Sequence, residues 1–259
     1  MSLIPRTNEE IELLRKSGEI SAIALKKVLE SVKEGVSLLE LEKIAEDEII
    51  KNGGESSFKS VPGYFHTTCL TVNDEVVHGL PRDIVLKKGD ILSIDLGTVY
   101  KGWHTDCAWS VIVSGKGGGK RRKNEKLEKF LKAGEKALWD GIDKAQNGNK
   151  VGDISNAIQT EIEKNGYRVV RSLVGHGVGK ELHEEPEIPG YGAKGKGITL
   201  KSGMSLAIEA IYTESTPEVD LASDGWTIVS GDGSLGGLFE MSVIVLDKGC
   251  EVLTDWRSV

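Results

Sequence analysis

Apolar and polar residues alternate with helical spacing in two long segments, one near the start of each half of the chain. In each segment the spacing predicts a long helix, a glycine turn, a second amphipathic helix and a stop at a glycine. We expect Asn8 and Ser37 to be the N-caps of the first helix pair, with Glu40 completing a capping box behind Ser37. Gly53 is the expected left-handed C-cap.

Short apolar runs follow each helical segment and predict strands, which cover 67–72, 91–96 and 104–113, then 168–174, 204–213, 226–229 and 238–246. A turn near Tyr100 to Gly102 joins the second and third of these strands into a hairpin. Helix pairs followed by groups of strands indicate an α+β fold.

The two halves repeat one another at a constant offset. Identities at that offset include Ala24 with Ala137, Gly35 with Gly148, Glu48 with Glu161, and Gly53 with Gly166. The shared order of helices makes coincidence a poor explanation. We therefore expect a single catalytic domain over 1–259, built from pseudo-repeat halves at about 8–113 and 125–246. A site at the interface of the halves is a common arrangement.

Acidic residues interrupt the apolar runs. Asp95, Glu209 and Glu240 each lie inside a predicted strand, and Asp106 lies on the partner strand of the hairpin, almost opposite Asp95. His176, between two glycines, is the fifth member of the set. An unpaired buried carboxylate is costly, so such groups require cations or protonation. Two divalent metal ions would cancel about four negative charges, and the pattern predicts a two-metal hydrolase.

Buried ion pairs are the structural alternative for these acidic residues. They would need basic partners in the same strands, yet the runs 91–96, 206–212 and 238–246 contain no Lys or Arg. The sequence therefore favours metal ligation.

Composition allows this interpretation and removes competing classes. A chain of 259 residues with 39% hydrophobic residues can bury a sizeable core. Its net charge of −7 argues against binding DNA through bulk charge. Three widely spaced cysteines indicate neither a disulfide framework nor a cysteine zinc site. No apolar segment is long enough to cross a membrane, so we expect a cytoplasmic protein without membrane contact.

Several motifs surround the five residues, namely Asn73-Asp74-Glu75-Val76-Val77-His78-Gly79, Gly175-His176-Gly177-Val178-Gly179, His183-Glu184-Glu185-Pro186 and Asp224-Gly225-Trp226-Thr227. With these motifs, the chain resembles the methionine aminopeptidases, in particular the type I bacterial form. The resemblance spans nearly the whole chain, and the second half lacks the long insertion of the type II form. It implies the pita-bread fold, in which a mixed, mainly antiparallel sheet is covered by helices.

The resemblance also implies roles for the five residues. Asp106 and Glu240 would bridge two divalent metal ions (Co, Mn, Fe or Zn), Asp95 would chelate one of them, and His176 with Glu209 would complete the other. Glu209 would also serve as the general base. Ligation by oxygen with one imidazole suits all four metals. A monovalent cation is a further expected cofactor.

The substrate-binding residues come from the same resemblance. His183 would hydrogen-bond the scissile amide, and His78 would lie beside the leaving amide and help to protonate it. Tyr64, Cys69 and Trp226 would line the pocket for the methionine side chain, where aromatic rings and sulfur favour a thioether.

The chain departs from common family members at a few positions. Phe58, Val61 and Leu182 occupy pocket positions where other residues are usual. Ala210 follows Glu209 where proline is common, and Met241 follows Glu240 where histidine is common. We expect the latter two changes to affect the surroundings of the ligands and to leave activity intact.

Removal of the initiator methionine from nascent proteins with a small second residue is the function that the resemblance implies. The alternatives are a prolidase-like or aminopeptidase P-like enzyme of the same fold, and a non-catalytic pita-bread binding module. The expected partner is the N-terminal peptide of a nascent protein, and the expected state is a monomer. The basic cluster Lys120-Arg121-Arg122-Lys123 is interpreted as a solvated loop, with a transient ribosome contact as the functional alternative.

Overall fold

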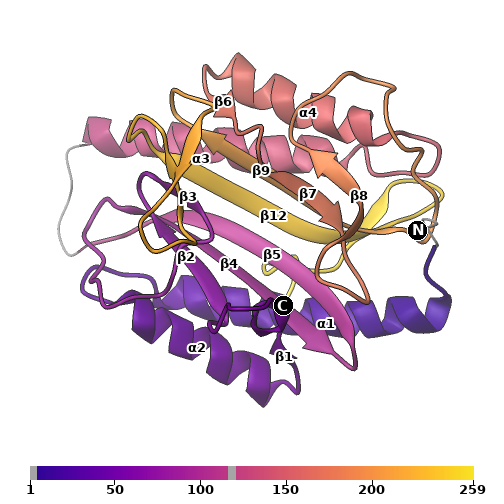
Figure 1. Cartoon of the computed structure of the whole chain (residues 1–259), viewed down its shortest axis with the longest axis horizontal. Coiled ribbons are helices and arrows are strands. Elements are labelled where there is room, and N and C mark those ends of the chain that lie inside the picture. The colour runs from indigo at the N-terminus through magenta and orange to yellow at the C-terminus, as the bar shows by residue number, and fades with distance from the viewer. Residues whose placement is uncertain (1–4, 116–120) are drawn as a thin grey trace.

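The structure is a computed structural model that describes residues 5–115 and 121–259. Its helices are α1 (Asn8–Ser31), α2 (Leu38–Lys51), the 3-10 helix η1 (Phe58–Ser60), α3 (Arg121–Ile142) and α4 (Val151–Lys164). Figure 1 shows α1 and α2 along one side of the molecule and α3 and α4 along the other, with the strands between them. The two expected helix pairs are thus confirmed.

The first helix pair begins at two capping boxes. Ser37 caps α2 as expected: the Glu40 amide donates to Ser37 Oγ at 3.2 Å, and the Ser37 amide donates to Glu40 Oε2 at 2.8 Å. For α1 the expectation was wrong by one residue, because Thr7 is the N-cap and Asn8 is the first helical residue. Thr7 forms a capping box with Glu10, which satisfies two helix-end amides reciprocally.

Glycines at matching positions of the two halves have the same backbone conformation. Gly35 and Gly148 have φ of +93° and +88°, and Gly53 and Gly166 have φ of +83° and +88°. In this left-handed region a side chain is strained, so glycine is the favoured residue. The matched geometry supports the sequence repeat.

Within the described residues, ten strands form the main sheet, and three form a small second sheet. The strands are β1 (Glu55–Ser56), β2 (Thr68–Val72), β3 (Glu75–Val77), β4 (Ile91–Tyr100), β5 (Trp103–Ile112), β6 (Arg168–Val169), β7 (Val174–Gly177), β8 (Glu184–Pro189), β9 (Ser205–Thr213), β10 (Val219–Leu221), β11 (Ile228–Ser230), β12 (Gly236–Val245) and β13 (Cys250–Val252).

The order in the main sheet is β1-β4-β5-β12-β9-β7-β8, with β2 beside β4, β13 beside β12 and β6 beside β9. The small sheet has the order β10-β11-β3. The pairing of β5 with β12 joins strands from the two halves into one antiparallel sheet. The centre of this sheet is therefore built from both halves of the chain.

Two strand predictions need correction. The β4–β5 hairpin turns at Lys101 and Gly102, both with positive φ, so β4 continues to Tyr100 instead of ending at 96, and β5 is shifted by one residue from the predicted 104–113. The segment predicted at 168–174 is not one strand, because it contains β6 and the loop before β7. The turn length matters for the site, since it sets the register between β4 and β5.

The helices cover one face of the main sheet. Helix α1 packs on β4 and β5, and α3 packs on β9 and β12. Alternate strand residues such as Ile94, Ile208 and Phe239 are fully buried there, and each contributes roughly 1.5–3 kcal/mol of burial free energy. The opposite face of the same strands remains available for polar side chains. Among the described helices, none has the length and apolar character needed to cross a membrane.

Candidate metal centre

One row of side chains crosses the sheet from β2 to β9 on its free face, which is the face that the helices do not cover. The register pairs Cys69 with Asp95, Asp95 with Ala108, Ala108 with Glu240, and Glu240 with Glu209. Residues directly opposite each other on antiparallel strands point to the same face. The row therefore gathers three of the expected ligands and the pocket cysteine on one surface.

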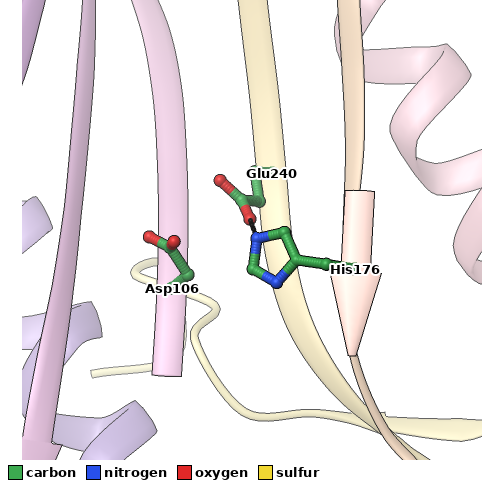
Figure 2. A group of neighbouring side chains, drawn as sticks. All are labelled: Asp106, His176 and Glu240. Carbon is green, nitrogen blue, oxygen red and sulfur yellow. Dashed lines mark ion pairs between the residues drawn. The ribbon is translucent and has the colours of Figure 1, made fainter. Parts of the chain in front are cut away.

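A second row, two residues along the strands, supplies the remaining ligands. Asp106 lies opposite Gly97, two residues along β4 from Asp95, which agrees with the expectation that it lies almost opposite Asp95. His176 on β7 pairs with Ala207 of β9. Figure 2 shows the side chains of Asp106, His176 and Glu240 converging from three strands.

The distances within this convergence suit a metal ion. Ligand atoms of Asp106, His176 and Glu240 all lie within 4.8 Å of one another. His176 Nε2 is 4.0 Å from Glu240 Oε1. Together with Asp95 and Glu209 on the adjoining row, the structure brings all five expected ligands to one place.

The four carboxylates are held in an unfavourable environment. Burial raises the pKa of Asp106 to about 7. Burial and then the neighbouring Asp106 carboxylate raise the pKa of Glu209 to about 8. The same two causes raise the pKa values of Asp95 and Glu240 well above their usual range. Such a cluster resists full ionisation unless cations neutralise it.

The donor atoms themselves fit divalent cations. Within the described residues, Asp95 Oδ1 and Glu240 Oε1 are buried without a hydrogen-bond partner. His176 Nδ1 donates to the Gly177 carbonyl at 2.9 Å, which leaves Nε2 free toward Glu240. Burial, and then His183, lower the pKa of His176 to about 4, so the imidazole is neutral at physiological pH. Hard oxygens plus one neutral imidazole suit Mn, Fe, Co or Zn.

His78 and His183 line the cavity that also contains the five expected ligands. The His183 ring centroid is 4.5 Å from that of His176. His78 has φ of +57°, a conformation that is strained for a residue other than glycine and that clusters at functional sites. Burial lowers the pKa of both His78 and His183, which keeps them neutral.

The cavity, of about 320 Å³, has an aromatic end next to Asp95. Tyr64, Cys69 and Trp226 lie there as expected, in one cluster with Phe58. Tyr64 Oη donates to the Thr68 carbonyl at 2.7 Å and lies 3.2 Å from Cys69 Sγ. The Tyr64 and Trp226 rings meet edge to face with centroids 5.0 Å apart. These contacts fix the shape of the pocket.

An aliphatic group of residues also lines the cavity, and the sequence did not identify it. This group consists of Val77, Leu173, Ile211 and Leu238. A signal was present: Ile211 lies two residues after Glu209, and Leu238 lies two residues before Glu240. Strand residues two apart share a face, so both had to point into the site.

The two departures beside the ligands lie on the other face of the sheet. Ala210 and Met241 are both fully buried in the main hydrophobic core. Thr254 Oγ1 donates to Met241 Sδ at 3.3 Å. Because neither side chain points toward the carboxylates, these changes alter core packing and leave the ligand set untouched.

The basic cluster predicted as a loop can be placed only in part. Lys120 lies outside the described residues, and the side chains of Arg121, Arg122 and Lys123 are not described. The backbone from Arg121 onward belongs to α3, so the loop interpretation does not hold for those residues.

A sheet built from two halves, with buried carboxylates and a neutral histidine at its centre, defines a metal-dependent hydrolase. The model of metallopeptidase family M24 matches residues 12–246, and the chain belongs to that family.

Full-length relatives narrow the assignment. The chain is 40% identical over 252 residues to a methionine aminopeptidase of Clostridium perfringens, covering 97% of the chain and 98% of the relative. It is also 40% identical over 252 residues to methionine aminopeptidase 1 of Bacillus subtilis, covering 97% and 99%. The crystal structure of a Thermotoga maritima methionine aminopeptidase superposes with a TM-score of 0.92 at 38% identity, covering 98% and 99%. Within family M24 the chain thus groups with the methionine aminopeptidases.

Proposed function

We propose that the chain hydrolyses the first peptide bond of newly made proteins that begin with methionine, with a preference for a small second residue. The observation that carries the proposal is that the acidic rows, an aromatic cluster and an aliphatic cluster line one cavity. The aromatic end, with Tyr64, Cys69 and Trp226, suits a methionine side chain, because sulfur and aromatic contacts contribute about 0.3–1.5 kcal/mol each.

The five clustered residues form the proposed metal site. Asp95, Asp106, His176, Glu209 and Glu240 would supply the ligands for two divalent ions. Divalent ions bound there supply Lewis acidity, which lowers the pKa of water and polarises a carbonyl. Co, Mn, Fe and Zn all fit the donor set. The monovalent cation stays a prediction.

The protein's own side chains complete the reaction. Glu209 accepts the proton of the attacking water as the general base. His183 hydrogen-bonds the scissile amide, and His78 lies beside the leaving nitrogen and helps to protonate it. The small-residue preference follows from Leu173, Ile211 and Leu238, whose branched side chains narrow the space beyond the acidic rows.

Proline-directed peptidases are the nearest alternative. The prolidase of Pyrococcus furiosus superposes with a TM-score of 0.74 at 26% identity, and the chain covers 65% of that protein. The lower similarity and partial coverage disfavour this alternative. The binding-module alternative is disfavoured because all five ligand residues are present and converge.

A peptide panel tests the proposed activity. We expect metal-loaded enzyme to release methionine from Met-Ala-Ser and to leave Met-Lys-Ser and Ala-Pro intact. Cleavage of Ala-Pro alone would instead establish a proline-directed peptidase. Ribosome contact, a monomeric state and a cytoplasmic location stay predictions.

A further inference from the structure

The segment before α1 crosses the loop that carries His183. Arg6 is its central residue: the Arg6 amide donates to the Gly203 carbonyl at 2.8 Å, and Arg6 Nε donates to Ser205 Oγ at 3.0 Å. These two contacts fasten the segment to the start of β9. Arg6 Nη2 is directed at the loop between β7 and β8, residues 178–183.

The guanidinium of Arg6 holds both ends of that loop. Nη2 donates to the Val178 carbonyl at 3.4 Å and forms an ion pair with the Glu184 carboxylate. Val178 begins the loop, and Glu184 directly follows His183. The Arg6 side chain therefore links Val178 and Glu184, the two ends of the segment that carries His183.

Further hydrogen bonds make the loop respond as a unit. Glu184 Oε1 accepts from the Glu181 amide at 3.1 Å, and the Gly179 amide donates to the Glu181 carbonyl at 3.0 Å. The carboxylate that Arg6 holds is thus also the group that closes the turn leading to His183. Removing Arg6 would release the Glu184 carboxylate and would thereby also weaken its hydrogen bond to the Glu181 amide.

Close packing shows that the loop and Arg6 are fitted to each other. A Cβ added at Gly179 would lie 2.3 Å from Arg6 Nη2, so a larger residue would require the guanidinium to shift. Arg6 and Lys180 both place their charged groups over the Trp103 ring, 5.2 Å and 4.3 Å from its centroid. The Arg6 and Glu184 side chains are only 15% and 20% exposed, so solvent screens their pairing weakly.

We propose that Arg6 is a positioning residue for His183, acting through Val178 and Glu184. This inference rests on the proposed function only for its kinetic part. The His183 ring already lies 4.5 Å from that of His176, so a small displacement of the loop would move it relative to the scissile amide. Misplacing a substrate-binding group by about 1 Å can cost about 10²-fold in rate.

A double-mutant cycle tests whether Arg6 acts through His183. We expect Arg6→Ala to lower kcat/KM for Met-Ala-Ser by about 10- to 100-fold. In a His183→Ala background the same change should have an effect below about twofold, because the group it positions is gone. Arg6→Lys should recover part of the loss, since it keeps the charge and loses the forked geometry. If Arg6→Ala lowers kcat/KM by the same factor in the wild type and in the His183→Ala variant, the proposal is overturned.

Amide hydrogen exchange of residues 178–183 tests the same inference without any catalytic readout. Arg6→Ala should accelerate exchange in this loop by about tenfold or more while the core amides of β9 and β12 stay protected. Arg15→Ala is the matched control, because Arg15 pairs with Glu12 and Glu251 on the surface of α1. It should leave loop exchange unchanged.

The two readouts separate the possible failures. Loop exchange unchanged in Arg6→Ala would overturn the positioning role whatever the enzyme cleaves. A wild-type protein that releases no methionine, but whose loop exchange responds to Arg6→Ala, would sink the proposed function and leave the structural link to His183 standing.

Discussion

The two faces of the central strands are built from alternating residues of the same segments, yet they have opposite physical character. On β9 and β12, Ile208 and Phe239 pack against the helices and are fully buried. Their neighbours Glu209 and Glu240 point to the other face, where burial raises the pKa of both carboxyls. The helix face stabilises the fold, whereas the site face of the metal-free protein destabilises it. Bound cations would neutralise the buried carboxylates and so remove the destabilisation caused by the site face.

The largest expected effect comes from neutralising the site face. Glu240→Gln should lower kcat/KM by at least about 10³-fold, because a shared ligand and its charge are lost. In the metal-free protein the same variant should raise the midpoint of thermal unfolding, since a buried, repelling carboxylate is removed. Steady-state kinetics and calorimetry with chelator measure the two effects. A variant that loses activity and also unfolds earlier would break the comparison.

The adjacent residue on the helix face should behave in the opposite way. Phe239→Ala removes a buried ring that packs edge to face on Trp109, with centroids 4.9 Å apart. We expect the free energy of unfolding to fall by about 3–5 kcal/mol. The fraction that remains folded should bind metal normally. Urea unfolding at fixed pH measures the loss, and a change below about 1 kcal/mol would contradict the assignment of this face to stability.

The pH dependence of the metal-free protein sharpens the difference further. The pKa of Asp106 is raised to about 7 and that of Glu209 to about 8, so the native state keeps protons that the unfolded chain has released. The stability contributed by these two carboxyls should therefore decline as the pH rises from about 5 through 7 and 8. Urea unfolding with chelator at pH 5 and pH 8 measures this slope. Saturating metal should abolish this pH dependence. A free energy of unfolding that rises from pH 5 to pH 8 would contradict the raised pKa values of the buried carboxyls.

The smallest effect is expected at Met241, which follows a ligand in sequence but lies on the helix face. Met241→Leu conserves volume and loses only the hydrogen bond from Thr254. We expect a cost below about 1.5 kcal/mol in stability. The value of kcat/KM should stay within about twofold. A large change in metal affinity, measured by calorimetric titration, would show that this position reaches the site after all.

The same contrast explains what the sequence could reveal. Asp95, Glu209 and Glu240 were identifiable because a carboxylate inside an apolar strand violates the ordinary composition of strands. Ile211 and Leu238 line the same cavity but look like core residues in the sequence, and only their two-residue spacing from Glu209 and Glu240 separates them from Ile208 and Phe239. Apolar site residues carry no such violation, so they were missed.

Local geometry explains the remaining differences between the sequence predictions and the structure. Thr7 and Asn8 are neighbouring residues that can both cap a helix, and the sequence pattern does not choose between them. The offset of Asp106 from Asp95 depends on whether the hairpin turns through two or three residues. The role of Arg6 was invisible in the sequence, because its partners lie about 170 to 200 residues away along the chain.

The most direct test of the central claim is a metal titration of chelator-treated protein, followed by both calorimetry and methionine release from Met-Ala-Ser. Activity should be absent without metal and should rise to saturation as two equivalents of a divalent ion bind. Asp106→Asn, which changes one atom of the carboxylate, should lose tight binding and turnover together. Full activity in excess chelator, or an Asp106→Asn variant that turns over normally, would contradict the metal centre on the free face of the sheet.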